Sequence, residues 1–358
     1  MEEKGKKGRM DYTLLLIVVL LVVIGLVILY STSAYNGQVK FHDSFYYLKK
    51  QAFATVLGIV LMLFVAGMDY HIWQRLAVFG YLAAVALSVA VMLFGREING
   101  SKRWLALGPF SFQPSEFAKV ALILFLADLV TKNVKTIGKM WTLCRIMFWI
   151  LPIVGLVGAS NLSTAIIILG IGVILIFVAS PKYAQFALMG IAGACFMGIF
   201  LALESYRLER LAIWRNPEKY EKGYQTLQGL YAIGSGGVFG VGIGNSVQKL
   251  GFVPEAQNDM IFSIICEELG LFGAICLILL LIWRFFLIAS GSRDLFGALI
   301  ATGAMAHMMI QVILNIAVVT NTIPNTGITL PFISYGGTSV MFLLIEMGLV
   351  LSVSQVVD

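Results

Sequence analysis

The chain has 358 residues, of which 59% are hydrophobic and only 12% are charged, and its mean hydropathy is +0.91. Soluble domains carry about 25% charged residues, so this composition excludes an ordinary soluble globular protein and indicates a polytopic membrane protein. The net charge of +6 suits basic cytoplasmic loops and gives little reason to invoke nucleic acid as a partner.

Cysteine and histidine offer little material for a metal centre or a Ser-His-Asp triad. The four cysteines form no CxxC pair and lie in or beside apolar runs, which is typical of small core residues. The three histidines lie far apart in sequence. His307 falls inside an apolar run, where we expect a hydrogen-bonded core histidine. No metal-ligating residues are predicted.

Apolar runs long enough to cross a bilayer, about 20 residues each, recur along nearly the whole chain. The first follows the basic sequence MEEKGKKGRM and is long for the apolar core of a signal peptide, so we predict a retained helix. The sequence predicts an all-α polytopic membrane protein, a single domain over residues 1–358. Its ten or so transmembrane helices are expected at 12–33, 46–68, 73–94, 114–131, 144–160, 162–180, 183–204, 259–284, 295–320 and 335–356.

The distribution of Lys and Arg predicts the orientation of these helices. With a cytoplasmic N-terminus, twelve lie in short inside segments: Lys4, Lys6, Lys7, Arg9, Arg75, Lys132, Lys135, Lys139, Arg145, Lys182, Arg284 and Arg293. Six lie in short outside loops: Lys40, Lys49, Lys50, Arg96, Lys102 and Arg103. The long segment 205–258 adds six more outside, but long loops contribute weakly to orientation. We therefore predict cytoplasmic termini and place the segments 95–113, 205–258 and 321–334 outside.

The outer segment before the fourth helix reads NGSKRWLALGPFSFQPSEFAKVALILFLA. Pro114 stands where a helix can begin, and Glu116 and Lys119 are three residues apart, so they share one face of that helix. They either form a local ion pair or, together with Lys102 and Arg103, line an outer cavity. Spacing alone favours neither interpretation.

Two further outer segments are rich in glycine and proline. The run AIGSGGVFGVGIGNSVQK, between spans seven and eight, lacks the preceding strand and the GK[ST] of a nucleotide loop. It is typical of a re-entrant or surface-lying segment with closely packed backbone. The stretch NTIPNTGITLPFISYGGTSV, which contains Ser334 and Tyr335, is expected to form a wall of an outward cavity.

The eighth span opens with carboxylates, in GFVPEAQNDMIFSIICEELG. Glu255 and Asp259 are one helical turn apart at the outer surface. Glu267 and Glu268 lie about 12–13 Å deeper at about 1.5 Å per residue, and we expect them to be the only acidic residues near the bilayer midplane. Since adjacent helical residues point about 100° apart, at least one of the pair is predicted to be a structural acid bonded to a neighbouring helix.

These segments resemble the SEDS family (shape, elongation, division and sporulation). The motif GNSVQK…PEA is more similar to its FtsW/SpoVE branch than to RodA. The resemblance covers nearly the whole chain. It implies a ten-helix peptidoglycan glycosyltransferase that polymerises lipid II at the outer face of the bacterial cytoplasmic membrane, for division or sporulation. It also implies other divisome proteins and a class B penicillin-binding protein as partners.

The resemblance maps the family's catalytic aspartate onto Asp259. It maps polar positions that contact substrate onto Arg103, Glu116, Lys119 and Glu255, to which we add Lys102, Ser334 and Tyr335. The family's usual His-Thr after PEA is here Gln257 and Asn258, and a common acidic residue is here Asn161. No site role is predicted for Gln257 or Asn161.

Two alternatives to a polymerase stay open on the sequence. A lipid II flippase would also use broken helices and intramembrane charge, although its site would lie nearer the midplane. A non-catalytic scaffold would only position the penicillin-binding protein. A divalent cation, Mg²⁺ or Mn²⁺, would suit a pyrophosphate leaving group, but the sequence shows no ligand cluster for it.

The predicted orientation is tested by cysteine accessibility. In a background without native cysteines, Tyr220→Cys should react with a membrane-impermeant maleimide added to intact cells. Labelling of that site only after lysis would refute the orientation.

Overall fold

The computed structural model describes residues 10–98, 101–107, 110–187, 190, 193, 211–292 and 294–355. Its long helices are α1 (Tyr12–Phe41), α2 (Tyr46–Gly67), α3 (Tyr70–Phe94), α4 (Pro114–Asn133), α5 (Met140–Ser160), α6 (Leu162–Ala179), α9 (Tyr224–Gly236), α10 (Ile261–Gly291), α11 (Leu295–Val319) and α12 (Gly337–Ser354). Short 3-10 turns, η1 (Pro217–Lys219) and η2 (Glu221–Gly223), precede α9.

The helices confirm the all-α polytopic class. Within the described residues, seven are long and apolar enough to cross a membrane, namely α1, α2, α3, α5, α6, α11 and α12. Nine of the ten predicted spans coincide with described helices. The predicted seventh span, 183–204, falls largely outside the described residues.

The segment 95–113, which is predicted to lie outside, contains three short strands that the sequence analysis did not predict. They are β1 (Arg96–Ile98), β2 (Ser101–Leu107) and β3 (Phe110–Phe112), paired antiparallel in the order β1-β2-β3. This small sheet leads directly into Pro114 at the start of α4. It therefore presents Lys102 and Arg103 beside the same end of the bundle as the first turn of α4.

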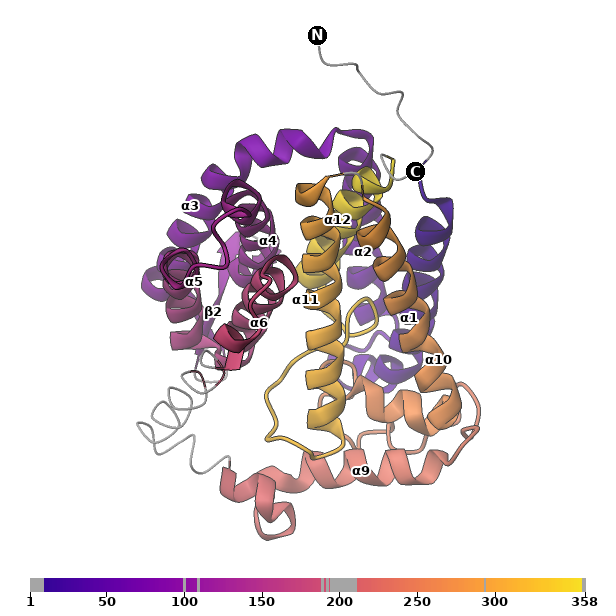
Figure 1. Cartoon of the computed structure of the whole chain (residues 1–358). Helices are drawn as coiled ribbons and strands as arrows, with labels where there is room; N and C mark the ends of the chain where they lie inside the picture. Colours follow the sequence, from indigo (N-terminus) through magenta and orange to yellow (C-terminus); the bar gives the residue numbers. More distant parts are fainter. Residues whose placement is uncertain are drawn as a thin grey trace.

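The described beginning and end of the chain meet at one end of the bundle, where Asp11 N–H donates to Ser354 Oγ at 3.1 Å. Figure 1 shows α9 lying across the opposite end, roughly perpendicular to α11. The termini and the 211–258 region thus lie at opposite ends of the bundle. The distribution of Lys and Arg also predicts that they lie on opposite sides of the membrane. Which face is cytoplasmic stays a prediction.

The break in α10 at Gly270 organises the region beneath α9. Gly270 has φ 68° and ψ −178°, so the helical hydrogen bonds across it are lost. Leu271 and Phe272 N–H groups instead donate to carbonyls of the glycine-rich segment, and two N–H groups of that segment donate to the carbonyls left free on α10. The four bonds are Leu271 to Gly237, Phe272 to Val238, Val241 to Glu267 and Gly242 to Glu268, at 2.9–3.1 Å.

The glycine-rich segment packs at backbone distance, as its composition predicts. A Cβ atom at Gly236 would lie only 1.9 Å from the carbonyl oxygen of Cys266 on α10. The segment also brings Lys249 to Glu268, with 2.8 Å between Nζ and Oε1. α9 and α10 are therefore joined by main chain as well as by side chains.

Both deep glutamates of α10 have hydrogen-bond partners. Glu268 Oε1 accepts from Ser31 Oγ on α1 at 2.9 Å and pairs with Lys249. Glu267 accepts from Ser246 Oγ and, at 3.0 Å, from Val247 N–H. The bond between Glu268 and Ser31 confirms that at least one of the pair is hydrogen-bonded to a neighbouring helix; a purely structural role for it stays a prediction.

Glu267 and Glu268 are not the only acids inside the bundle, so that part of the sequence analysis was wrong. Glu346 on α12 is 1% exposed and faces His307 on α11, with 2.8 Å between Oε2 and Nδ1. A single acid in an otherwise apolar span gives a weak sequence signal, and its partner lies 39 residues away. His307 has both ring nitrogens hydrogen-bonded, as expected of a core histidine.

The Gly270 break predicts a large penalty for any side chain there. An added Cβ would lie 2.3 Å from the Val238 carbonyl oxygen, and this backbone region costs a non-glycine residue about 1–3 kcal/mol. Gly270→Ala should therefore lower the Tm of the detergent-solubilised protein. Gly155→Ala on α5 is the control, because its Cβ would meet nothing within 4 Å. Equal Tm values for the two variants would contradict the proposed role of the break.

Candidate functional site

Asp259 lies at the N-terminal end of α10, two residues before the helix begins, and its side chain is half-buried. Gln225 on the first turn of α9 donates from Nε2 to Asp259 Oδ1 at 3.3 Å. The main-chain carbonyl of Asp259 accepts from Asn315 Nδ2 on α11 at 2.9 Å. Three helices therefore fix the position of this carboxylate.

Gln225 connects the two outer segments on either side of Asp259. Its Nε2 also lies 3.3 Å from the Pro254 carbonyl oxygen, and its Oε1 accepts from Asn325 Nδ2 at 3.3 Å. Pro254 belongs to the segment before α10 and Asn325 to the segment before α12. The sequence analysis missed Gln225, Asn325 and Asn315 because uncharged amides on apolar helices and turns give no compositional signal.

The surroundings of Asp259 favour its protonated form more than water does. Loss of hydration, together with the nearby charge of Glu255, raises the pKa of Asp259 to about 6. Hydrogen bonds from its own backbone N–H, Gln225 and Asn325 act in the opposite direction and lower the pKa. A carboxyl group with a pKa of about 6 is mainly ionised at neutral pH yet basic enough to accept a proton.

Glu255 is exposed and sits in a left-handed backbone conformation, with φ 52°. Non-glycine residues rarely adopt this conformation, and such strain gathers at functional sites. Asn258 holds it in place, since Asn258 N–H donates to the Glu255 carbonyl at 2.9 Å and Nδ2 donates to Oε2. Glu255 and Asp259 thus lie on one short turn, as their spacing predicts.

Glu116 and Lys119 form a buried ion pair in the first turns of α4. Lys119 Nζ lies 3.0 Å from Glu116 Oε1, and Lys119 and Glu116 are 1% and 6% exposed, respectively. Lys119 Nζ also lies 3.5 Å from Gln311 Oε1 on α11. The structure therefore shows the local ion pair, whereas a cavity shared with Lys102 and Arg103 stays a prediction.

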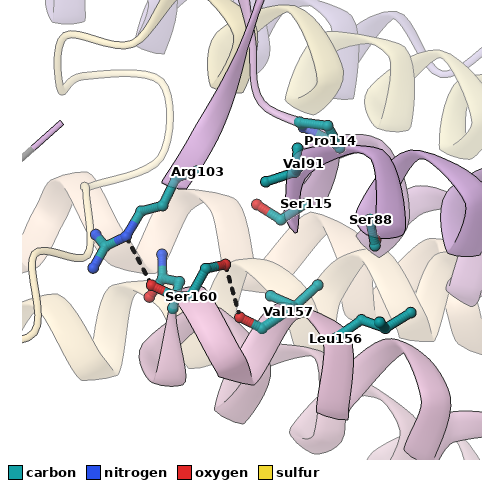
Figure 2. A pocket seen from close by; sticks show the side chains of 9 residues that line it. Ser88, Val91, Arg103, Pro114, Ser115, Leu156, Val157 and Ser160 are labelled. Atoms are coloured by element: carbon teal, nitrogen blue, oxygen red, sulfur yellow. Dashed lines mark hydrogen bonds between the residues drawn. The ribbon is translucent and has the colours of Figure 1, made fainter. Parts of the chain in front are cut away.

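Arg103 points from β2 towards the end of α5 and donates from Nε to the Ser160 carbonyl at 3.1 Å (Figure 2). The cavity beside it measures about 20 Å³, enough for a single water molecule. Its lining includes Ser88, Val91, Pro114 and Ser115. This cavity is too small for a lipid-linked sugar. Lys102, the neighbouring residue on β2, is exposed.

Ser334 and Tyr335 connect the segment before α12 to the rest of the site. Ser334 is 3% exposed, and its Oγ accepts from Leu330 N–H at 2.8 Å, an internal bond of that segment. Tyr335 N–H donates to the Gln257 carbonyl at 2.9 Å. The Tyr335 ring meets Tyr47 edge-on with centroids 5.0 Å apart. Gln257, for which the sequence predicted no site role, thus has a structural one.

The described residues contain no group of three or more His, Cys, Asp or Glu side chains that could hold a metal ion. Glu255 and Asp259 supply two carboxylates on one turn. Mg²⁺ is commonly bound by one or two carboxylates together with substrate phosphates. Two carboxylates, one of them the candidate base, do not make up a cation site, so no metal ion is assigned to Glu255 and Asp259.

The comparisons with known proteins agree over nearly the whole chain. The cell cycle protein family model for FtsW, RodA and SpoVE matches residues 12–358. Stage V sporulation protein E of Bacillus subtilis (strain 168) is 39% identical and the match covers 98% of each chain. The probable peptidoglycan glycosyltransferase FtsW of Trichlorobacter lovleyi is 35% identical, over 96% of this chain and 93% of that protein.

Solved structures give the same result. A chain from work described as "Structural coordination of polymerization and crosslinking by a peptidoglycan synthase complex" aligns with a TM-score of 0.82 at 30% identity, over 96% of this chain and 97% of that one. The rod shape determining protein RodA of Thermus thermophilus aligns with a TM-score of 0.71 at 28% identity, over 96% of each chain.

Proposed function

The chain belongs to the family of FtsW, RodA and SpoVE, and from this premise we propose that it is a peptidoglycan glycosyltransferase. It polymerises lipid II into glycan strands at the outer face of the bacterial cytoplasmic membrane. Relatives with over 30% identity along the whole chain are named as probable enzymes of this activity. The multi-pass helical fold suits a membrane-anchored substrate.

In the proposed reaction Asp259 is the general base. The acceptor sugar hydroxyl attacks the anomeric carbon of the donor, the bond from that carbon to the pyrophosphate oxygen breaks, and the hydroxyl proton passes to Asp259. The family resemblance implies an α-linked donor and a β-1,4 product. One inversion needs one base and no covalent intermediate.

The observation that carries this proposal is the setting of Asp259. It is half-buried at the N-terminal end of α10, its main chain is held by Asn315, and its carboxylate accepts from Gln225. Its pKa of about 6 keeps most of it ionised at neutral pH. A base performs best when its pKa lies near the working pH.

The remaining candidate residues are proposed to receive the charged donor. Lys102 and Arg103 stand at the outer edge of the bundle, where they can approach the pyrophosphate. Lys119 is buried against Glu116, so we assign it to the wall behind the site. Glu255, Tyr335 and Ser334 lie on the two segments that flank Asp259. Glu116 holds Lys119 in place.

We further propose cytoplasmic termini, an outward-facing site and a class B penicillin-binding protein as partner. A related chain was solved in work on a peptidoglycan synthase complex that couples polymerisation and crosslinking. Other divisome proteins and membrane lipids complete the expected partners. Similarity to both Stage V sporulation protein E and FtsW points to synthesis of a division or sporulation septum.

Lipid II transport is the second candidate, and the buried pair of His307 and Glu346 favours it. Ionisable side chains deep in a helix bundle are typical of transport pathways. Vesicles that contain the purified protein and fluorescent lipid II separate the two functions. Polymer formed without movement of lipid between leaflets supports the polymerase, whereas movement without polymer supports transport.

Asp259→Asn should abolish polymerisation while expression and partner binding stay normal. Loss of a general base costs about 10²–10⁴ in rate, whereas loss of a helix-end carboxylate costs only about 0.3–1 kcal/mol in stability. Purified protein, lipid II and partner are assayed for glycan polymer on gels. Polymer at near wild-type level would exclude Asp259 as the base. Absence of polymer from the wild-type protein would contradict the polymerase and favour the non-catalytic scaffold.

The rate of polymerisation should also depend on the ionisation of Asp259. Because its pKa is raised to about 6, the carboxylate is the majority form only above that pH. The rate should fall about tenfold per pH unit below 6 and level off above it. Initial rates between pH 5 and pH 8 test this, with folding followed by Tm at each pH. A rate that stays constant from pH 5 to pH 8 would contradict the prediction.

A further inference from the structure

Three buried polar side chains lie in a row on α11. His307, Gln311 and Asn315 are four residues apart, so they share one face of the helix and span about 12 Å along its axis. Their exposed fractions are 1%, 3% and 0%. Polar groups inside a membrane bundle are unfavourable unless they are hydrogen-bonded, and they usually serve a function.

Asn315 joins the two chain segments that flank the candidate base. Its amide nitrogen has two hydrogens, and Nδ2 lies 2.9 Å from the Asp259 carbonyl oxygen and 2.7 Å from the Ile328 carbonyl oxygen. Both carbonyls can only accept, so both donors of the amide are used. The side chain therefore sets the separation between the segment before α10 and the segment before α12.

Gln311, one turn deeper, makes the equivalent connection to Lys119. Its Nε2 donates to the Thr329 carbonyl at 2.9 Å, which fixes the orientation of the amide. Its Oε1 therefore faces Lys119 Nζ at 3.5 Å and His307 Nε2 at 2.9 Å. Thr329 directly follows Ile328, so the Gln311 and Asn315 side chains donate to the carbonyls of consecutive residues.

His307 and Glu346 hold Gln311 in that orientation. Because Gln311 Oε1 can only accept, His307 Nε2 must carry a proton. His307 Nδ1 lies 2.8 Å from Glu346 Oε2, so one proton is shared in that contact as well. The imidazole ring is thus hydrogen-bonded at both nitrogens, and Glu346 on α12 supports the row through its contact with His307.

We propose that Gln311 and Asn315 are positioning residues for glycosyl transfer, an inference that rests on the proposed function. Asn315 places the Asp259 main chain, and Gln311 places the Lys119 ammonium, both relative to residues 328–329. The base and the buried cation thereby keep a constant separation, while the His307–Glu346 pair keeps Gln311 from rotating. Neither amide touches the reacting atoms.

Asn315→Asp tests this most directly, since it keeps the shape of the side chain and replaces its two donors with an acceptor. The variant should lower kcat about 10–100-fold, because small displacements of catalytic groups cost factors of this size. The acidic limb of its pH–rate profile should also move away from pH 6, since the surroundings of Asp259 change. A loss of folded protein would lower the rate equally at every pH.

Thr302→Val is the matched control on the same helix. Thr302 is also buried, but its Oγ1 bonds only to the Ala298 carbonyl of its own helix. This variant should keep the wild-type kcat and pH profile. Gln311→Glu repeats the test at the second amide, and Glu346→Gln, which can still bond to His307 Nδ1, should keep more activity than Glu346→Leu.

Wild-type protein and Asp259→Asn are measured in parallel, so that failure of the proposed function is seen separately. If those two behave as proposed, wild-type kcat and an unshifted pH limb in both Asn315→Asp and Gln311→Glu would overturn the inference. Failure of both variants to fold would give the row a purely structural role and would overturn it as well.

Discussion

Backbone N–H and C=O groups within a membrane must find partners inside the protein, and this requirement shapes the outer half of the fold. At Gly270 the chain of helical hydrogen bonds in α10 stops, which would leave two carbonyls and two amides unpaired. The glycine-rich segment supplies all four partners. It can do so because glycines allow main chain to meet main chain. The position of α9, and with it Gln225, depends on this exchange.

Several buried carboxylates in the bundle pair with a basic side chain, whereas Glu267 accepts from Ser246 Oγ and Val247 N–H. Glu116 pairs with Lys119, Glu268 with Lys249, and Glu346 with His307. The interactions that act on Asp259 come instead from amides and from the like charge of Glu255. Loss of hydration and the like charge of Glu255 raise the pKa of Asp259, whereas a cation beside a carboxylate lowers its pKa. The proposed base therefore differs from the paired acids in its surroundings.

Hydropathy was sufficient to predict every long helix that the structure describes except α9, because about 20 apolar residues per crossing is a strong and local signal. Glycine and proline content likewise predicted where the chain would depart from a helix. Contacts between side chains on different helices were harder to predict. His307 and Glu346, for example, are 39 residues apart in sequence, and each is isolated in its apolar run. Gln225 and Asn315 left no trace in charge or periodicity, and only the packing of α9 and α11 brings them to Asp259. The strands before α4 depend on short-range pairing that composition does not reveal.

Asp259 is held from two sides by groups of different kinds. Asn315 on α11 binds its main-chain carbonyl, and Gln225 on α9 binds its carboxylate. The first contact determines where the residue stands, and the second contributes to how readily it takes a proton. Because the two contacts come from different helices, position and basicity depend on different parts of the fold. The proposed base can therefore stay in place when the segments that carry Glu255 and Asn325 move.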